Sequence, residues 1–347
     1  MASHSACSYE TTLHEEYEAI RGECDPWILA LTEPPSPAAA QFWVDCVFPW
    51  FFSMAYPGCP AERVVHITKI LTWFFFFDNE ADDPAHSGSN AVDAAAGTLR
   101  RHQLILSCCA GEPPRDGVAD ARTMKQMWAL HEVVQAMLKN ISPSLHARML
   151  ESLKDYLNAI TIQCHYRSSG HVPTLEEYIA MRRPDSLMYF AYQLIEYGLG
   201  IELDQETLNS DLFLQLLAAA VEHVGLTNDV FSCHVERFSD DQINLPCVIL
   251  FNARDPAFTF EDAMEQALCV LEEVDARYVR LMAEVQKSSL IHKPGFAAYV
   301  RTLETNMAGN KAWSQKTARY KSKLSPADER VVLDVLQPAP GVPVTCT

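Results

Sequence analysis

Apolar residues recur every three or four positions along most of the chain, which is the spacing that places them on one face of an α-helix. The polar residues between them are mostly good helix formers, and no stretch shows the sustained alternation of apolar and polar residues that is typical of a β-strand. The pattern therefore predicts a protein built from helices. The clearest predicted helices cover residues 120–138, 144–161, 209–236 and 260–285.

Helix-breaking residues separate these segments. Thr174 followed by Glu177 has the spacing of a capping box and predicts a helix that begins between them. No internal repeat is present. We therefore expect one all-α domain over residues 1–347, with its core at about 25–325 and flexible terminal segments. About ten helices would surround either a central element or a cavity, which the apolar pattern alone does not distinguish. The main breaks lie at residues 34–37, 84–90, 111–114, 170–173 and 294–295.

Composition is that of a soluble protein with a large core, because hydrophobic residues make up 48% of the chain and charged residues 21%. The apolar run at residues 70–77 is far shorter than the roughly 18 residues that a membrane span requires. Residues 1–20 have neither the basic n-region nor the apolar h-region of a secretory signal. We therefore expect a cytoplasmic protein with no membrane span.

Cysteine spacing and net charge exclude several classes of partner. The eleven cysteines are scattered from Cys7 to Cys346 without a C-x-x-C pair, which favours buried free thiols over a disulfide framework or a zinc site. The formal net charge of -18 argues against a nucleic-acid partner, since such binding needs a basic face. It is compatible with a small anionic ligand if metal ions accompany it, because a bound cation dominates the local field.

An acidic cluster directly follows five aromatic residues in the segment WFFFFDNEADD, residues 73–83. Asp78 and Asp82 are four positions apart, so both carboxylates lie on one face if this segment is helical. Like charges repel at that spacing, and the C-terminal end of a helix is itself negative. A multivalent cation would turn this repulsion into attraction, whereas a solvated acidic loop is the alternative interpretation.

A second polar feature lies in the predicted helix at residues 209–236. Asn228, Ser232 and Glu236 follow one another at intervals of four and share one helix face. An amide, a hydroxyl and a carboxylate oxygen form a hard ligand set that suits Mg²⁺ better than zinc. A solvated helix face is again the alternative, but the apolar residues around the three predict a largely buried helix, where unpaired polar groups are unfavourable.

Asn228, Ser232 and Glu236, called the ladder below, lie in the segment NDVFSCHVE. This segment resembles the N-D-x-x-S-x-x-x-E signature of class I terpene synthases, or terpene cyclases, of the bacterial and fungal monodomain type. In this family an aspartate-rich D-D-x-x-D/E motif ends an upstream helix, and Asp78 to Asp82 stand in that place. The resemblance implies metal ligation by Asp78, Asp82, Asn228, Ser232 and Glu236. Asn79 departs from the motif, and the distal ligand is either Asp82 or Asp83.

Further positions match the family in the right order. The residue 46 positions before Asn228 is Arg182, where the family has an arginine that senses diphosphate. The resemblance assigns catalytic roles to Arg182, to Asp185 as linker and to Ser186 as effector, at a helix break that Pro184 makes reasonable. Near the C-terminus, Arg319 and Tyr320 match the family's Arg-Tyr pair and would bind the diphosphate together with Arg182.

The resemblance implies an all-α fold around a hydrophobic active-site cavity, whose wall would include Phe51, Phe74, Phe77 and Trp313. It implies a lyase that uses Mg²⁺, three ions in all, with Mn²⁺ as the alternative ion. The reaction is ionisation of a prenyl diphosphate followed by cyclisation of the carbocation. We expect a sesquiterpene synthase that acts on farnesyl diphosphate as a monomer or homodimer. The alternatives are a diterpene synthase acting on geranylgeranyl diphosphate, a chain-elongating prenyltransferase, and a non-catalytic helical bundle that binds a hydrophobic ligand or protein.

Overall fold

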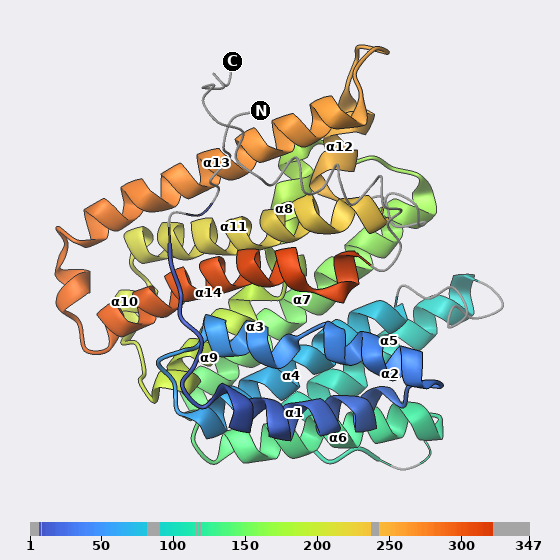
Figure 1. The fold of residues 1–347 in the computed structure, drawn as a ribbon, viewed down its shortest axis with the longest axis vertical. Helices are drawn as coiled ribbons and strands as arrows, with labels where there is room; N and C mark the ends of the chain where they lie inside the picture. Colours follow the sequence, from blue (N-terminus) through green and yellow to red (C-terminus); the bar gives the residue numbers. More distant parts are fainter. Residues whose placement is uncertain are drawn as a thin grey trace.

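The computed structural model describes residues 7, 9–81, 91–115, 117, 119–236 and 243–321. Within these residues every regular element is a helix, and the all-α prediction is confirmed (Figure 1). The α-helices are α1 (Tyr17–Thr32), α2 (Pro37–Asp45), α3 (Phe48–Ala55), α4 (Ala61–Ala81), α5 (Ala91–Cys109), α6 (Ala121–Leu138), α7 (Pro143–Ser169), α8 (Leu175–Asp185), α9 (Met188–Leu199), α10 (Gln205–Leu208), α11 (Asp211–Glu236), α12 (Leu245–Asn252), α13 (Phe260–Val285) and α14 (Phe296–Lys316). Two 3-10 helices, η2 (Ser289–His292) and η3 (Ala318–Tyr320), flank α14.

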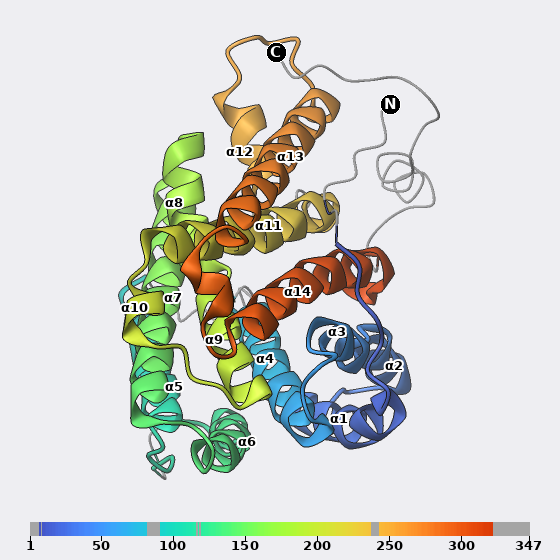
Figure 2. The ribbon, with the colours of Figure 1, turned by 90° about the vertical axis from the view of Figure 1, so that its left-hand side faces the viewer.

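The helices form two packed groups that meet along α14. In the first group α4 packs against α1, α3, α6 and α9. In the second, α11 packs against α8, α12 and α13. Figure 2 shows α14 lying between α11 and α3, and it contacts both. The buried side chains accordingly form one large cluster and a smaller one made by α8, α11, α12 and α13.

Several helix ends follow from local sequence chemistry. Asp120 caps α6 by accepting hydrogen bonds from the backbone N–H groups of Arg122 and Thr123, each at 3.0 Å. The predicted capping box of Thr174 and Glu177 is present at the start of α8. The bounds predicted for α6 and α13 agree with the structure to within one residue.

Helix α7 is longer than predicted. Its apolar periodicity ends near Ile160, which is buried, but the helix continues to Ser169 with Ile162 exposed. The chain leaves the helix at Gly170, whose backbone φ of +67° lies in the left-handed region that favours glycine. The side chains described in these extra turns are exposed or half-buried, with Tyr166 packed at the edge of the smaller buried cluster, so no apolar pattern marked them.

The ordered core begins earlier than the predicted boundary near residue 25. Helix α1 starts at Tyr17 and buries Ile20 and Cys24. The preceding segment, residues 9–14, runs alongside the helices in Figures 1 and 2. His14 is buried, and its Nε2 forms a 2.8 Å hydrogen bond with the backbone oxygen of Cys59. Polar contacts hold this segment, and the apolar pattern does not reveal them.

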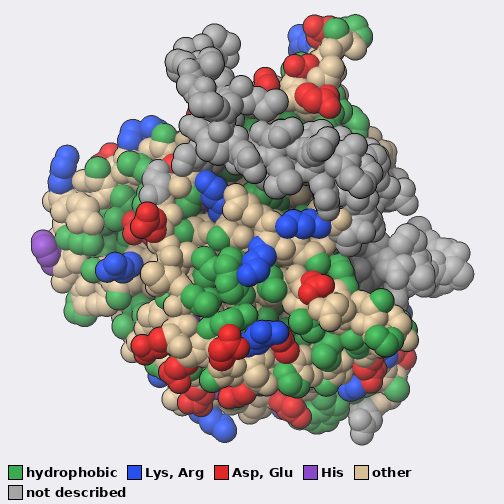
Figure 3. All heavy atoms as spheres, viewed as in Figure 1, with side chains coloured by type: hydrophobic (Ala, Val, Ile, Leu, Met, Phe, Trp, Pro, Cys, Tyr) green, Lys and Arg blue, Asp and Glu red, His purple; other side chains and the backbone are tan. Residues whose placement is uncertain are grey.

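Charge is unevenly spread over the face drawn in Figure 3. Acidic side chains gather over its lower part, where Figure 1 shows α1, while lysines and arginines occupy its middle. Over the described part of the chain, the helices are all too short or too polar to cross a membrane.

Candidate functional site

The ladder predicted on α11 forms as expected from its spacing. Asn228 and Glu236 are partly buried and Ser232 is 2% exposed. Val230 and Phe231 are buried around them, so the helix holds this polar face against the protein interior. The Ser232 hydroxyl finds no hydrogen-bond partner within the described residues. A buried hydroxyl without a hydrogen-bond partner is unfavourable unless a ligand binds it. The Ser232 oxygen lies between the Asn228 amide and the Glu236 carboxylate along the helix, and these three oxygen donors fit Mg²⁺.

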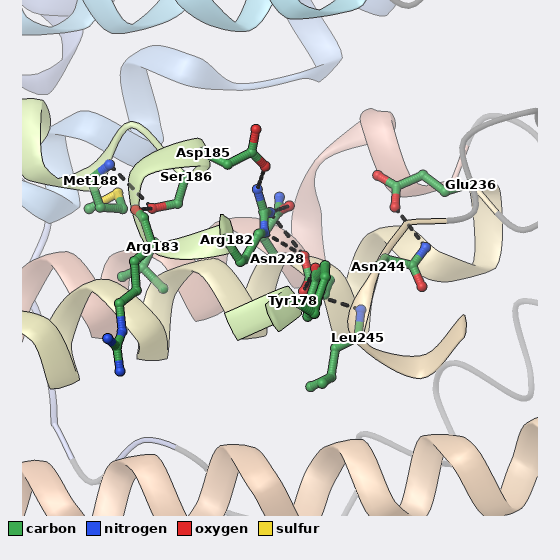
Figure 4. Close-up of polar contacts among 12 residues, drawn as sticks. Tyr178, Arg182, Arg183, Asp185, Ser186, Met188, Asn228, Glu236, Asn244 and Leu245 are labelled. Atoms are coloured by element: carbon green, nitrogen blue, oxygen red, sulfur yellow. Dashed lines mark hydrogen bonds and ion pairs between the residues drawn. The ribbon is translucent and has the colours of Figure 1, made fainter. Parts of the chain in front are cut away.

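Arg182 of α8 lies directly against this ladder. Its Nη2 donates a 2.8 Å hydrogen bond to Oδ1 of Asn228. Its Nη1 donates to Asp185 at 2.9 Å and its Nε to Asp229 at 3.0 Å. Burial opposes the guanidinium charge, but Asp229, Asp185 and Glu236 outweigh it and hold the pKa of Arg182 well above its usual range. Figure 4 shows Arg182 directed toward Asn228, while the adjacent Arg183 extends the opposite way.

Asp229 and Tyr178 complete this arrangement, and the sequence analysis did not single out either residue. Asp229 is 2% exposed, and its carboxylate accepts hydrogen bonds from the Tyr178 hydroxyl and from the backbone N–H of Leu245, the latter at 3.4 Å. Burial raises the pKa of Asp229, although Arg182 acts in the opposite direction. The available signal was an acidic residue in the middle of a predicted buried helix, which requires a buried partner.

The helix break predicted at Pro184 is present between α8 and α9. Pro184 is the last residue but one of α8, and Leu187 has a φ of +58° in the left-handed region, which a branched side chain seldom adopts. The Ser186 hydroxyl donates to the carbonyl oxygen of Arg183 at 2.9 Å. Asp185 and Ser186 therefore stand at the turn beside Arg182, as Figure 4 shows.

Helix η3 (Ala318–Tyr320), called the closing segment here, reaches the same site from the C-terminal side. The Tyr320 hydroxyl accepts a hydrogen bond from Nδ2 of Asn228. Burial raises the pKa of Tyr320, with Glu236, Arg182 and Asp229 among the charges that act on it. The adjacent Arg319 places its guanidinium 5.2 Å from the ring centroid of Phe75 in α4. Helix η3 thus links the α11 ladder to the acidic end of α4.

Asp78 stands at that end of α4. Its side chain is partly exposed, and it follows Phe75 by three positions and Phe74 by four, so all three share one helix face. Arg319 lies over Phe75, so the Phe75 side of this face contacts η3. Asp82 and Asp83 lie outside the described residues.

The four expected cavity-wall aromatics lie in different surroundings. Phe51 stacks on Trp313, with ring centroids 4.7 Å apart, and Trp313 also packs against Tyr320 at 5.6 Å. Phe74 faces the centre of the bundle, where it meets Phe190 of α9 at 5.6 Å and Tyr156 of α7 at 5.9 Å.

Phe77, the fourth of these aromatics, points elsewhere. It is two residues from Phe75, so the two rings emerge about 200° apart on the helix. Phe77 stacks on Trp73 with centroids 5.7 Å apart and packs against His102 of α5 at 6.2 Å. The guanidinium of Arg101 lies 4.9 Å from its ring centroid. The structure therefore places Phe77 in the contact between α4 and α5.

A cavity of about 360 Å³ opens beside the closing segment. Its lining combines charged and apolar residues, and Lys316 at its edge lies 4.3 Å from the ring centroid of Trp50. The lining residues are Asp45, Val47, Lys316, Ala318 and Lys321.

In the part of the chain that the structure describes, no three His, Cys, Asp or Glu side chains group as a metal site. A metal site at the ladder would instead use the amide and hydroxyl oxygens of Asn228 and Ser232 beside a single carboxylate.

Comparison with known proteins identifies the family of this chain. Residues 69–274, more than half of the chain, match the family model described as terpene synthase family 2, C-terminal metal binding. The chain is 28% identical over 244 residues to microbial terpene synthase-like protein 13 of Selaginella moellendorffii, covering 70% of this chain and 65% of the relative. It is 30% identical over 221 residues to sesquiterpene synthase 3 of Postia placenta, covering 64% of this chain and 58% of the relative. The matches thus span less than two thirds of either relative's length.

The fold also matches a solved structure. A crystal structure of α-eudesmol synthase superposes with a TM-score of 0.74 at 19% identity, covering 89% of this chain and 97% of that one. An identity this low supports the fold alone, whereas the family model covers α4 from residue 69 onward and all of α11, which carry the candidate ligands. The chain belongs to the terpene synthase family.

Proposed function

We propose that this chain is a class I terpene cyclase that ionises a prenyl diphosphate with Mg²⁺ and cyclises the resulting carbocation. The observation that carries the proposal is the cluster in which Asn228 hydrogen-bonds to both Arg182 and Tyr320, beside the orphaned hydroxyl of Ser232. Cations, hydroxyl groups and oxygen ligands converge there, as recognition of a metal-bound diphosphate requires.

The polar side chains would hold the leaving group. Asn228, Ser232 and Glu236 on α11, with Asp78 on α4, would bind the metal ions, which supply Lewis-acid stabilisation of the departing diphosphate. Arg182 and the Tyr320 hydroxyl would donate hydrogen bonds to its oxygens. In an effective dielectric near 20, one pair of unit charges 4 Å apart is worth about 4 kcal/mol before screening. Several such contacts can therefore supply much of the stabilisation that the reaction needs.

The reaction itself requires little covalent chemistry from the protein. The allylic C–O bond breaks heterolytically, and its electron pair remains on the diphosphate oxygen. A distal C=C double bond of the same chain then gives its π electrons to the carbocation, which forms the new carbon–carbon bond and moves the positive charge. The resulting cation gives a proton to the departed diphosphate and becomes an alkene. Aromatic faces stabilise passing positive charge by about 0.5–2 kcal/mol each when water is excluded. Phe74 and Phe75 are suited to this role because they share the helix face of Asp78, whereas Phe77 packs against α5.

Farnesyl diphosphate is the substrate that we propose. Sesquiterpenes have fifteen carbon atoms and derive from a C15 diphosphate, and the relative from Postia placenta is named a sesquiterpene synthase. A second relative, 26% identical over 182 residues, is named sesquiterpene synthase Agr1 of Cyclocybe aegerita. Both names support the C15 substrate over the C20 alternative.

The test is incubation of the purified chain with the C10, C15 and C20 diphosphates, each with and without Mg²⁺, followed by mass spectrometry of the organic extract. We expect a cyclic C15 product from farnesyl diphosphate that forms only when Mg²⁺ is present. No product from any of the three would contradict the proposal. A linear diphosphate of greater length would indicate a chain-elongating enzyme instead.

A further inference from the structure

The start of α12 contacts α11 at two acidic side chains. The Nδ2 of Asn244 donates a 3.0 Å hydrogen bond to Oε2 of Glu236. The backbone N–H of the next residue, Leu245, donates to Oδ2 of Asp229 at 3.4 Å. Asp229 and Glu236 are seven residues apart, so they lie two turns apart on the same side of α11. Two adjacent residues therefore hold the candidate ligand Glu236 and the acid Asp229, which follows the candidate ligand Asn228. Figure 4 shows Asn244 and Glu236 facing each other.

Asn244 is itself fixed in place. It is 2% exposed and serves as the N-cap of α12, where its Oδ1 accepts a 3.1 Å hydrogen bond from the backbone N–H of Cys247. This contact sets the orientation of the amide, because the oxygen must face the helix and the nitrogen must face Glu236. Leu245 and Val248 are fully buried in the cluster formed with α8 and α13. The start of α12 is thus held by burial and by a capping hydrogen bond.

The second contact acts through Asp229. Its two oxygens accept hydrogen bonds from Nε of Arg182 and from the hydroxyl of Tyr178, which is fully buried. A guanidinium held at Nε keeps its plane fixed, and its two terminal nitrogens then have defined directions. One of them reaches Asn228.

We propose that Asn244 and Asp229 are positioning residues of this site, with Asn244 orienting the Glu236 carboxylate for metal binding and Asp229 orienting Arg182 for diphosphate binding. This inference rests on the proposed function, since it takes Glu236 as a metal ligand. Neither residue touches the substrate. Hydrogen bonds to ligating side chains from such outer positions are worth roughly 10–100-fold in metal affinity.

Asn244→Ser separates positioning from helix capping. Serine caps a helix N-terminus about as well as asparagine, but its side chain is too short to reach Glu236. We expect the affinity for Mn²⁺, measured by electron paramagnetic resonance with inorganic pyrophosphate present, to fall about tenfold. The thermal unfolding midpoint should stay close to that of the unsubstituted chain. Asn244→Thr, which also caps, is the second variant if the first folds poorly.

Asn252→Ser is the matched control for Asn244→Ser. Asn252 lies at the other end of α12, and its Nδ2 donates to the carbonyl oxygens of Pro173 and Val248 at 2.8 and 2.9 Å. It has no contact with Glu236, so its substitution should leave Mn²⁺ affinity unchanged. Equal losses of affinity in Asn244→Ser and Asn252→Ser would contradict a specific role for Asn244.

Asp229→Asn tests the other contact. The asparagine keeps the size of the side chain and an acceptor for Tyr178, but it removes the charge opposite Arg182. We expect the affinity for pyrophosphate to fall about tenfold, as for other outer-position contacts, while the affinity for Mn²⁺ alone is retained. A loss confined to Mn²⁺ would contradict this assignment.

The outcomes distinguish this inference from the proposed function. If the unsubstituted chain binds Mn²⁺ and forms product, and both variants match it in metal and pyrophosphate affinity, the positioning roles are wrong and the function stands. If the unsubstituted chain neither binds Mn²⁺ nor forms product, the proposed function fails and the inference fails with it.

Discussion

Helices α4 and α11 both present candidate metal ligands, but they hold them by different physical means. On α11 the ligand Asn228 is hydrogen-bonded to two side chains, Arg182 and Tyr320, and Glu236 is held by Asn244. On α4, Asp78 follows a run of aromatic residues, among which Phe74 is 2% exposed and packs against two other rings. The polar network acts on the candidate ligands of α11 themselves, and the aromatic packing holds the body of α4.

The two helices should therefore respond differently to substitution. A buried polar network fixes the directions of its members, and removing one charge leaves its partners uncompensated. Aromatic packing fixes a helix as a whole, and its loss acts first on stability. Substitutions of the polar residues around α11 should therefore lower ligand binding and turnover more than they lower the free energy of unfolding. Substitutions of the aromatic residues that precede Asp78 on α4 should mainly lower the free energy of unfolding. Removal of a buried charge, as at Arg182 or Asp229, should change both.

The largest effect is expected for Arg182→Ala. Loss of the guanidinium removes a donor to the diphosphate, which should lower the rate of product formation by about 100-fold or more. It also leaves the buried Asp229 and Asp185 without their counter-charge, which should lower the free energy of unfolding by about 3–5 kcal/mol. Product formation and urea unfolding measure the two effects.

Arg183→Ala is the control for this substitution. Arg183 is paired with Glu222, which keeps a second partner in Arg277, and its side chain points away from the site. It should have a much smaller effect on both quantities. If the two alanine variants behave alike, the role given to Arg182 is wrong.

The next largest effect is on stability in the α4 region. Phe74→Ala removes a ring that is 2% exposed and should lower the free energy of unfolding by about 3–5 kcal/mol. Phe75→Ala is the matched comparison, because Phe75 is only partly buried and should cost less. Urea denaturation measures both values. A smaller loss for Phe74 than for Phe75 would contradict the packing account of this helix.

The smallest effect concerns acid sensitivity on the side of α4 where Phe77 meets His102. Burial, together with Arg101, lowers the pKa of His102 to about 4. As pH falls below the unfolded value of about 6.5, the unfolded chain binds a proton that the folded chain refuses until about pH 4. The folded state should therefore lose stability over this window, by at most about 1.4 kcal/mol per pH unit for this group.

His102→Leu should remove that contribution. The difference in free energy of unfolding between this variant and the unsubstituted chain should be constant above pH 7 and should move in favour of the variant as pH falls toward 5. Urea unfolding at pH 5, 6 and 7.5 measures the trend. A difference that does not change with pH would show that His102 is protonated in the folded chain as readily as in the unfolded one.

Sequence reasoning located residues whose positions follow from helical periodicity. Asn228, Ser232 and Glu236 share a face because residues four apart on a helix must do so. The break at Pro184 follows from the chemistry of proline. The same rule explains the direction of Phe77. Phe77 is adjacent to Asp78 in the sequence and was therefore expected beside the site, but adjacent residues on a helix point about 100° apart.

Contacts between distant segments could not be predicted in this way. Asp229 meets Tyr178 across 51 residues, and neither partner has a local pattern that names the other. Residues 9–14 are held by contacts such as that of His14 with Cys59, which produce no periodic signal, so the predicted core began too late. The fold class depended on local pattern, whereas the orientation of the site depends on tertiary packing.

The central claim is that the α11 ladder is a metal site, and Ser232→Ala tests it most directly. The Ser232 hydroxyl is buried without a hydrogen-bond partner among the described residues, so its removal should leave the free energy of unfolding unchanged or slightly raised. Ser53→Ala is the control, because Ser53 is a second buried hydroxyl without such a partner. The measurement is Mn²⁺ binding by electron paramagnetic resonance with inorganic pyrophosphate present. We predict that Ser232→Ala lowers the Mn²⁺ affinity about tenfold or more while Ser53→Ala leaves it unchanged, and an Mn²⁺ affinity in Ser232→Ala equal to that of the unsubstituted chain would contradict the account.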